Sequence, residues 1–188
     1  MKKLFSLSLA ALATFALLGS TGTAQMMNNN PSVGGAAMYR NKNIVENALN
    51  SPIHTTLVSA VKAAGLVETL MGKGPFTVFA PTNDAFAKLP AGTVDTLVMP
   101  ENKGTLTKVL TYHVVAGKMD SKKIMQAIKK GKGTATFRTV SGDTLTATMH
   151  NGGVMLRDEK GGTSMVTTAN VYQKNGVIHV IDTVLMPN

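Results

Sequence analysis

The chain has 188 residues, no cysteine, and 19 Lys and Arg against 10 Asp and Glu, which gives a formal net charge of +9. The missing cysteine excludes a structural disulfide and the acylated cysteine of a bacterial lipoprotein, so an exported form depends on core burial for its stability. The positive charge favours anionic surfaces, but the absence of Trp and the few Tyr and Phe make nucleic acid a poor candidate partner.

Residues 1–24 have the pattern of an export signal peptide. Lys2 and Lys3 precede an apolar run from Leu4 to Leu18, and small residues lie around Ala24. The run is shorter than the roughly 20 apolar residues of a membrane-spanning helix. We therefore expect cleavage after Ala24 and no transmembrane segment in the mature chain, with a retained anchor as the alternative. Cleavage removes two lysines and no acid, which lowers the net charge from +9 to +7, and the protein is then periplasmic or extracellular.

Residues 25–40 show no apolar period and contain a run of asparagines, Pro31 and the Gly34-Gly35 pair. This composition is typical of a flexible leader. The remaining residues, 41–188, have the length of one domain and can bury a core.

Two apolar ribbons organise the predicted fold. Residues 76–80 carry β-branched and aromatic side chains on both faces, as a buried strand does, and Pro81 ends the strand because it has no N–H. Thr82 is a natural N-cap for a short helix with Asp84 in its first turn. A similar ribbon lies at 176–181, near the end of the chain. We expect the two ribbons to lie together in one compact body.

The first half of the chain has mainly helical spacing of apolar residues, and the second half alternates. Helices are predicted at 44–49, 55–64, 66–71, 83–89, 92–99, 102–113 and 121–130. From Thr134 onward, apolar and polar residues alternate, which predicts strands. Turns are expected at Asn151-Gly152-Gly153, Gly161-Gly162 and Asn175-Gly176. The layout is an α+β fold, helix-rich in its first half and hairpin-rich in its second, rather than a series of β-α units.

Three segments, Phe76 to Phe86, Leu110 to Val115 and Gly176 to Asp182, resemble in order and spacing the signature segments of the fasciclin domain. The resemblance covers essentially all of 41–188. It implies a fasciclin-like wedge of two β-sheets with helices packed alongside, used in extracellular adhesion and matrix contacts. His54 departs from the family pattern, where many relatives carry Phe. A single copy is present, whereas animal adhesion members tend to carry several.

The sequence offers little for catalysis. The Gly-x-Ser-x-Gly nucleophile pattern is absent, and the Gly-Lys-Gly triplets at 72–74 and 131–133 lack the rest of a phosphate loop. The four histidines are too widely separated to form a local metal motif: His54, His113, His150 and His179. We therefore expect no enzyme activity, no metal and no cofactor, with a metal site formed by histidines that meet in space as the alternative.

Several other polar and sulfur-containing residues are expected to have structural roles. Asp158 and Glu159 are adjacent in a Gly-flanked loop and are expected to face solvent. Asp182 is expected to accept backbone hydrogen bonds at the end of the last strand, away from His179, because residues i and i+3 of a strand point to opposite faces. Three methionines occupy positions that we expect to face the core: Met125, Met149 and Met155.

Tyr112 and His113 are candidate partner-binding residues, because the resemblance implies integrin-type binding by this Tyr-His region of adhesive fasciclin domains. The helical spacing supports a second interpretation. Leu106, Val109, Leu110 and His113 share one helix face, so His113 completes an apolar face and Tyr112 packs beside it.

A run of lysines forms the other candidate binding set: Lys122, Lys123, Lys129, Lys130 and Lys132. Such a run is usually the solvated face of a helix. The functional alternative is electrostatic docking to an acidic polysaccharide or an anionic membrane surface.

The sequence predicts an exported, non-enzymatic interaction module for adhesion, whose partner is a cell-surface or matrix protein or an anionic polysaccharide. The alternative is an envelope protein that binds a small ligand or an acidic polysaccharide. A small-ligand carrier would be distinguished by an apolar pocket with a few inward polar groups. The oligomeric state is left open.

Overall fold

The computed structural model describes residues 30–188. The predicted export signal, 1–24, and the start of the predicted leader lie outside the described residues. The helices are α1 Ile44–Leu49, α2 Thr55–Ala64, α3 Val67–Met71, α4 Asn83–Ala87, α5 Thr93–Leu97, the 3-10 turn η2 Pro100–Asn102, α6 Lys103–Tyr112 and α7 Ser121–Lys130. The strands are β1 Phe76–Pro81, β2 Val114–Ala116, β3 Thr134–Arg138, β4 Thr144–His150, β5 Gly153–Arg157, β6 Thr163–Gln173 and β7 Gly176–Ile181.

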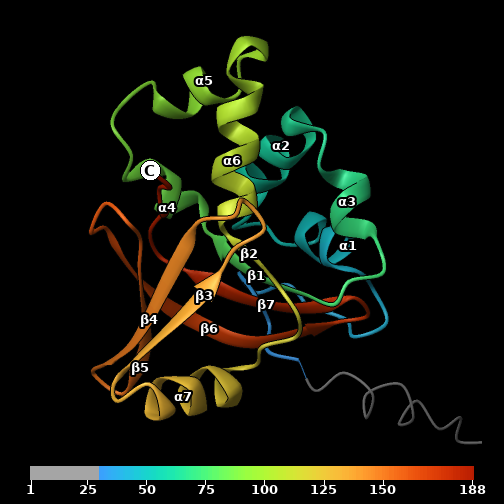
Figure 1. Ribbon diagram of the computed structural model, residues 1–188. Helices are drawn as coiled ribbons and strands as arrows, with labels where there is room; N and C mark the ends of the chain where they lie inside the picture. The colour runs from blue at the N-terminus through green and yellow to red at the C-terminus, as the bar shows by residue number, and fades with distance from the viewer. Residues whose placement is uncertain (1–29) are drawn as a thin grey trace, which may run out of the picture.

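The strands form one seven-stranded sheet in the order β2-β1-β7-β6-β5-β4-β3. The pairing of β1 with β7 is parallel, and the other neighbouring strands are antiparallel. The Val140 N–H donates to the Val114 carbonyl at 2.7 Å, so the chain after β3 returns to β2 and the sheet nearly closes. In Figure 1, α7 lies at the opposite end of this strand layer from α2, α3 and α6.

The long strand β6 joins the two halves of the sheet. Its first residues pair with β5, and its later residues pair with β7 across two register shifts. The predicted α+β class is confirmed, with helices before the hairpins. The two sheets of the predicted wedge are the two halves of one continuous strand order.

The two apolar ribbons are direct neighbours, as predicted, because β1 and β7 pair from Phe76 with Gly176 to Pro81 with Ile181. Side chains of one phase, such as Val78 and Val180, belong to a core beneath the helices α1, α2 and α6. Side chains of the other phase, such as Phe79 and Ile181, belong to a second core that includes α7. Burial on both faces explains why neither ribbon alternates with polar residues.

The predicted helix ends are confirmed where a cap was identified. The Thr82 Oγ1 accepts the Ala85 N–H at 3.2 Å at the start of α4. Gly65 ends α2 with φ 73°, a left-handed conformation that glycine adopts without steric cost. The Asp120 carboxylate accepts the Lys123 N–H at 2.8 Å at the start of α7.

The prediction of a flexible leader over 25–40 is wrong for residues 30–40, which pack against the domain. The Asn30 side chain donates to the Tyr172 carbonyl at 2.6 Å and accepts the Tyr172 N–H at 2.9 Å, which attaches this segment to β6. Val33 and Met38 are 4% and 2% exposed within the helix-side core. The segment shows no regular spacing of apolar residues. The buried side chains of Val33 and Met38 and the two hydrogen bonds of the Asn30 side chain with Tyr172 nevertheless hold it against the domain.

The core positions predicted for methionine are also wrong. Met125 and Met149 are exposed at 40% and 43%. In α7 the buried face belongs to Ile124 and Ile128, and the next residue along a helix is turned about 100° away. In β5, Val154 and Leu156 are buried, so Met155 between them points to the other face and is half-buried.

Asp158 does not face solvent as predicted. It is buried, and its carboxylate accepts the Gly162 N–H at 2.6 Å and the Met186 N–H at 2.9 Å. Asp182 has the predicted role, since its carboxylate accepts the Met165 N–H at 2.9 Å beyond the end of β7.

Candidate functional site

The five predicted lysines lie on α7 and just after it, and all five are solvent-exposed. We call this set the lysine face: Lys122, Lys123, Lys129, Lys130 and Lys132. On the opposite side of the helix, Ile124 and Ile128 are buried in the core beneath β3, β4 and β5. The packing of these two isoleucines turns the charged side chains outward.

Polar contacts fix the start of α7 on the sheet. Asn170 adopts φ 63° at the irregular part of β6, and its side-chain oxygen accepts the Ser121 N–H at 2.7 Å. The Asn170 amide also donates to the Ser121 hydroxyl at 2.7 Å. The His179 Nε2 donates to the Met119 carbonyl at 2.8 Å just before the helix. The lysine face is therefore carried on a helix that is anchored at its beginning and along its apolar side.

The charges of the lysine face are not neutralised within residues 30–188. Two ion pairs form there, Lys88 with Asp182 and Lys108 with Asp143, and neither includes this face. One contact does use a lysine of the face, since Lys123 Nζ donates to the Lys118 carbonyl at 3.0 Å. Lys129 and Lys130 also lie in the last turn of α7, where positive charge complements the helix dipole. The arrangement can attract an anionic polymer without rearranging the protein.

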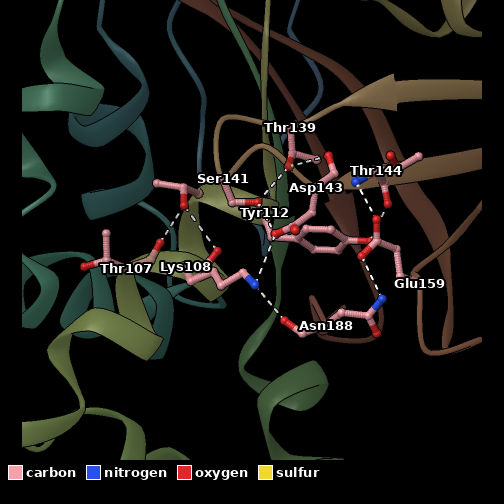
Figure 2. A network of polar contacts seen from close by, with 10 residues as sticks. Thr107, Lys108, Tyr112, Thr139, Ser141, Asp143, Thr144, Glu159 and Asn188 are labelled. Carbon is pink, nitrogen blue, oxygen red and sulfur yellow. Dashed lines mark hydrogen bonds and ion pairs between the residues drawn. The ribbon is translucent and has the colours of Figure 1, made fainter.

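Tyr112 lies inside the protein, with its side chain fully buried. Its hydroxyl donates to the Thr144 carbonyl at 2.7 Å (Figure 2). Around it, Glu159 accepts the Thr144 N–H at 2.9 Å and the Asn188 side-chain amide at 3.0 Å. Burial raises the pKa of Tyr112 to about 12, so the phenol remains a neutral donor. Tyr112 joins the end of α6 to β4 and has no surface to offer a partner in this conformation.

His113 is also internal, at 3% exposed. Its Nε2 accepts the Leu185 N–H at 3.1 Å, so the ring proton is on Nδ1 and is donated to the Val109 carbonyl at 2.8 Å. Burial lowers the pKa of His113 to about 4. These contacts agree with the interpretation in which His113 completes an apolar helix face and Tyr112 packs beside it. A partner-binding role for Tyr112 and His113 remains a prediction.

Ser51 and His54 form a local pair that was not predicted from the sequence. The Ser51 Oγ lies 2.8 Å from His54 Nδ1, and both residues are 3% exposed. The His54 Nε2 faces the Ala80 carbonyl at 3.4 Å, so it carries the ring proton and Nδ1 accepts from the serine hydroxyl. Burial lowers the pKa of His54. The i, i+3 spacing at a helix entry was the available signal, because such residues meet in one turn.

The remaining buried histidine, His179, stacks on Phe79 with ring centroids 5.6 Å apart. Its Nδ1 accepts the Asn170 N–H at 3.4 Å, and burial lowers its pKa. None of the hydrogen bonds of His54, His113 or His179 is to a carboxylate in the described structure. Within residues 30–188, no three His, Asp or Glu side chains gather closely enough to hold a metal ion.

An apolar cavity of about 110 Å³ lies between the helices and the sheet. We call it the helix-side cavity. Its walls come from the segment at 33–38, the helices α1, α2, α3 and α6, and the strands β1, β2, β6 and β7. The Ser51-His54 pair forms part of its lining.

No helix in the part of the chain that the structure describes is long and apolar enough to cross a membrane.

Comparisons with known proteins give the relationships of this chain. The family model of the fasciclin domain matches residues 52–187. Protein sll1483 of Synechocystis is 44% identical over 180 residues, which are 94% of this chain and 93% of that protein. The cell surface glycolipoprotein MPB83 of Mycobacterium bovis is 35% identical over 172 residues, 88% of this chain and 70% of that protein. The immunogenic protein MPB70 of M. bovis is 38% identical over 145 residues, 74% of this chain and 66% of that protein.

Among solved structures, a FAS1 domain pair from the insect cell adhesion molecule fasciclin I has the same fold. The TM-score is 0.68 at 17% identity, and the match covers 78% of this chain and 51% of the insect chain. The family match, the extent of the related sequences and the shared fold agree with the three signature segments found in the sequence. The chain belongs to the fasciclin domain family.

Proposed function

We propose that this protein is an exported, non-enzymatic module of the cell surface that attaches to anionic polysaccharide of the envelope or matrix through its lysine face. The observation that carries the proposal is the exposure of five lysines on and after one helix that is anchored to the sheet, with no carboxylate paired to them in residues 30–188.

The physical mechanism is multivalent electrostatic attraction. One exposed ion pair contributes about 0 to 1 kcal/mol, so a single lysine gives little binding. Several lysines on one rigid helix act on the same polymer, and each further contact is then made at a high effective concentration. Salt screens exposed charges over roughly 8 Å at physiological ionic strength. Attachment through this face is therefore sensitive to salt.

The relatives support the cellular setting of the proposal. MPB83 is named as a cell surface glycolipoprotein, and fasciclin I as a cell adhesion molecule. The pattern of residues 1–24, with Lys2 and Lys3 before an apolar run, supports export. Non-enzymatic action is supported by the internal hydrogen bonds of His54, His113 and His179, which engage the ring nitrogens of the three buried histidines.

Tyr112 and His113 enter the proposal as supporting residues. Their side chains hold the end of α6 against β4 and the C-terminal segment.

Sedimentation of the protein with purified cell envelopes tests the proposal. A variant with Lys122, Lys129, Lys130 and Lys132 replaced by Gln removes four charges and leaves the hydrogen bond of Lys123 in place. The matched control replaces four exposed lysines elsewhere: Lys73, Lys103, Lys160 and Lys174. We expect the first variant to lose most of its envelope binding at low salt and the control to keep it. Equal binding by both variants would contradict the proposal.

A further inference from the structure

The helix-side cavity is not used by the proposed attachment, which takes place on α7 at the other end of the strand layer (Figure 1). Its lining consists mainly of aliphatic side chains from the helices and from the sheet. Among them are Leu57 and Val61 of α2, Val78 of β1 and Ile178 of β7. An apolar cavity of comparable size in another protein, about 150 Å³, stays dry and binds benzene. A volume of about 110 Å³ can therefore take an apolar group without displacing ordered water.

The buried polar side chains in the lining are already paired within the protein. Asn47 accepts the Tyr39 N–H at 2.9 Å and donates to the Tyr39 carbonyl at 2.7 Å. Ser51 pairs with His54 at 2.8 Å, and both ring nitrogens of His113 are bonded to the backbone. The wall consequently offers a ligand no free buried donor or acceptor. A polar ligand would lose its own hydrogen bonds with water on entry, which disfavours it relative to a hydrocarbon chain.

The lining also includes residues that are exposed to solvent, so we infer that the cavity opens to the surface beside them. Leu49 at the end of α1 is 55% exposed and Val140 is 46% exposed, whereas most aliphatic residues within 30–188 are buried or half-buried. Lys62 of α2 lines the same cavity and is exposed, and no carboxylate in the described chain pairs with it. One lysine side chain therefore both lines an otherwise apolar cavity and reaches solvent.

We propose that the helix-side cavity binds the hydrocarbon chain of a fatty acid, with the carboxylate paired to Lys62. The cavity is smaller than the roughly 300 Å³ of a typical small-molecule pocket. It holds part of the chain, and the remainder lies along the exposed aliphatic residues at the opening. The energy comes from apolar surface removed from water, about 0.8 kcal/mol for each buried methylene group. The carboxylate-lysine pair at the opening adds selectivity for an acid.

Displacement of a fluorescent fatty acid by palmitate, measured with the intact protein, tests the site. Ala48 of α1 lines the cavity, and Ala48→Leu fills part of it with a good helix former. Ala63 of α2 is exposed and does not line the cavity, so Ala63→Leu is the matched control. We expect saturable one-to-one binding by the wild type, at least tenfold weaker binding by Ala48→Leu, and no change in Ala63→Leu. Palmitate should also raise the melting temperature of the wild type more than that of Ala48→Leu.

The role of Lys62 is tested separately with Lys62→Glu and with the uncharged ligand hexadecanol. We expect this variant to bind palmitate several-fold more weakly and hexadecanol with unchanged affinity, while Lys73→Glu changes neither. The absence of saturable palmitate binding by the wild type, or equal affinities of Ala48→Leu and Ala63→Leu, would overturn the site. Unchanged palmitate affinity in Lys62→Glu would overturn the assignment of an acid as ligand. Because the site is distant from the lysine face, neither result depends on polysaccharide attachment.

Discussion

The Leu185 N–H donates to the Nε2 of His113 at 3.1 Å, and this bond joins the end of α6 to the segment that follows β7. The bond requires an unprotonated Nε2, so His113 is neutral in the folded protein. Burial holds the pKa of His113 at about 4, against 6.5 for an ordinary histidine. Burial also lowers the pKa of His54 and of His179.

These lowered pKa values predict that acid destabilises the fold. In the unfolded chain the histidines take up protons near pH 6.5, whereas folded His113 takes up its proton only near pH 4. Between these values the unfolded state binds more protons than the folded state. The free energy of unfolding therefore has its full value above about pH 6.5 and decreases as the pH falls toward 4. His113 alone accounts for a loss of about 3 kcal/mol. Urea unfolding at a series of pH values measures this loss.

Variants of single histidines assign the pH effect. His113→Gln should give a smaller dependence of unfolding free energy on pH, with His54 and His179 supplying the remainder. A wild-type protein equally stable at pH 7 and pH 4.5 would show that these rings are not buried as neutral groups.

Gly176 is expected to be indispensable to the pairing of β1 with β7. A Cβ at this position would lie 2.1 Å from the Phe76 carbonyl oxygen, which is backbone and cannot move aside without separating the strands. Gly176→Ala should therefore prevent folding or lower the melting temperature sharply. Gly104 in α6 is the control, because a Cβ there meets no atom within 4 Å. Gly104→Ala should raise stability by up to about 1 kcal/mol, since alanine is the better helix former. Similar melting temperatures for the two variants would refute the close approach of the strands.

Asn175 connects three elements through its buried side chain. Its oxygen accepts the Ile44 N–H at 3.0 Å, and its amide donates to the Leu70 carbonyl at 2.8 Å and the Gly72 carbonyl at 2.9 Å. Asn175→Ala leaves these backbone groups without partners, and each such buried group costs about 1 to 3 kcal/mol. We expect a total loss of about 3 kcal/mol in chemical unfolding, against almost none for Asn41→Ala on the surface. A loss below about 1 kcal/mol would mean that water replaces the amide.

Tyr112→Phe separates a structural role from a contact role. The substitution removes the hydrogen bond from the hydroxyl to the Thr144 carbonyl and keeps the buried ring. We expect a loss of about 1 kcal/mol in unfolding free energy and unchanged binding to cell envelopes. Tyr112→Ala should reduce stability by about 3 to 5 kcal/mol, because it leaves a cavity. Loss of envelope binding by Tyr112→Ala with a melting temperature near the wild-type value would instead identify Tyr112 as a contact residue.

The parts of the fold that could be predicted from the sequence are those with local signals. The β1 and β7 ribbons have apolar side chains in both phases, and Thr82, Asp120 and Gly65 are cap residues at helix ends. The exposure of the lysine face also follows from local spacing, since Ile124 and Ile128 define the buried side of α7.

The parts that could not be predicted depend on contacts between distant residues. Residues 30–40 are held by Asn30 and Tyr172, which are 142 positions apart. The helix-side cavity is lined by the segment at 33–38, four helices, four strands and connecting loops, so no one stretch of sequence reveals it. Asp158 is buried because Gly162 and Met186 bring two N–H groups to its carboxylate, and the second of these comes from the far end of the chain.

Attachment through the lysine face is best tested by the salt concentration needed to elute the protein from a heparin column. We expect that replacing Lys122, Lys129, Lys130 and Lys132 with Gln lowers this concentration substantially more than replacing Lys73, Lys103, Lys160 and Lys174. Both variants have the same net charge, so only the position of the lysines differs. Elution of the two variants at the same salt concentration would contradict this expectation, because binding would then follow net charge and not the lysine face.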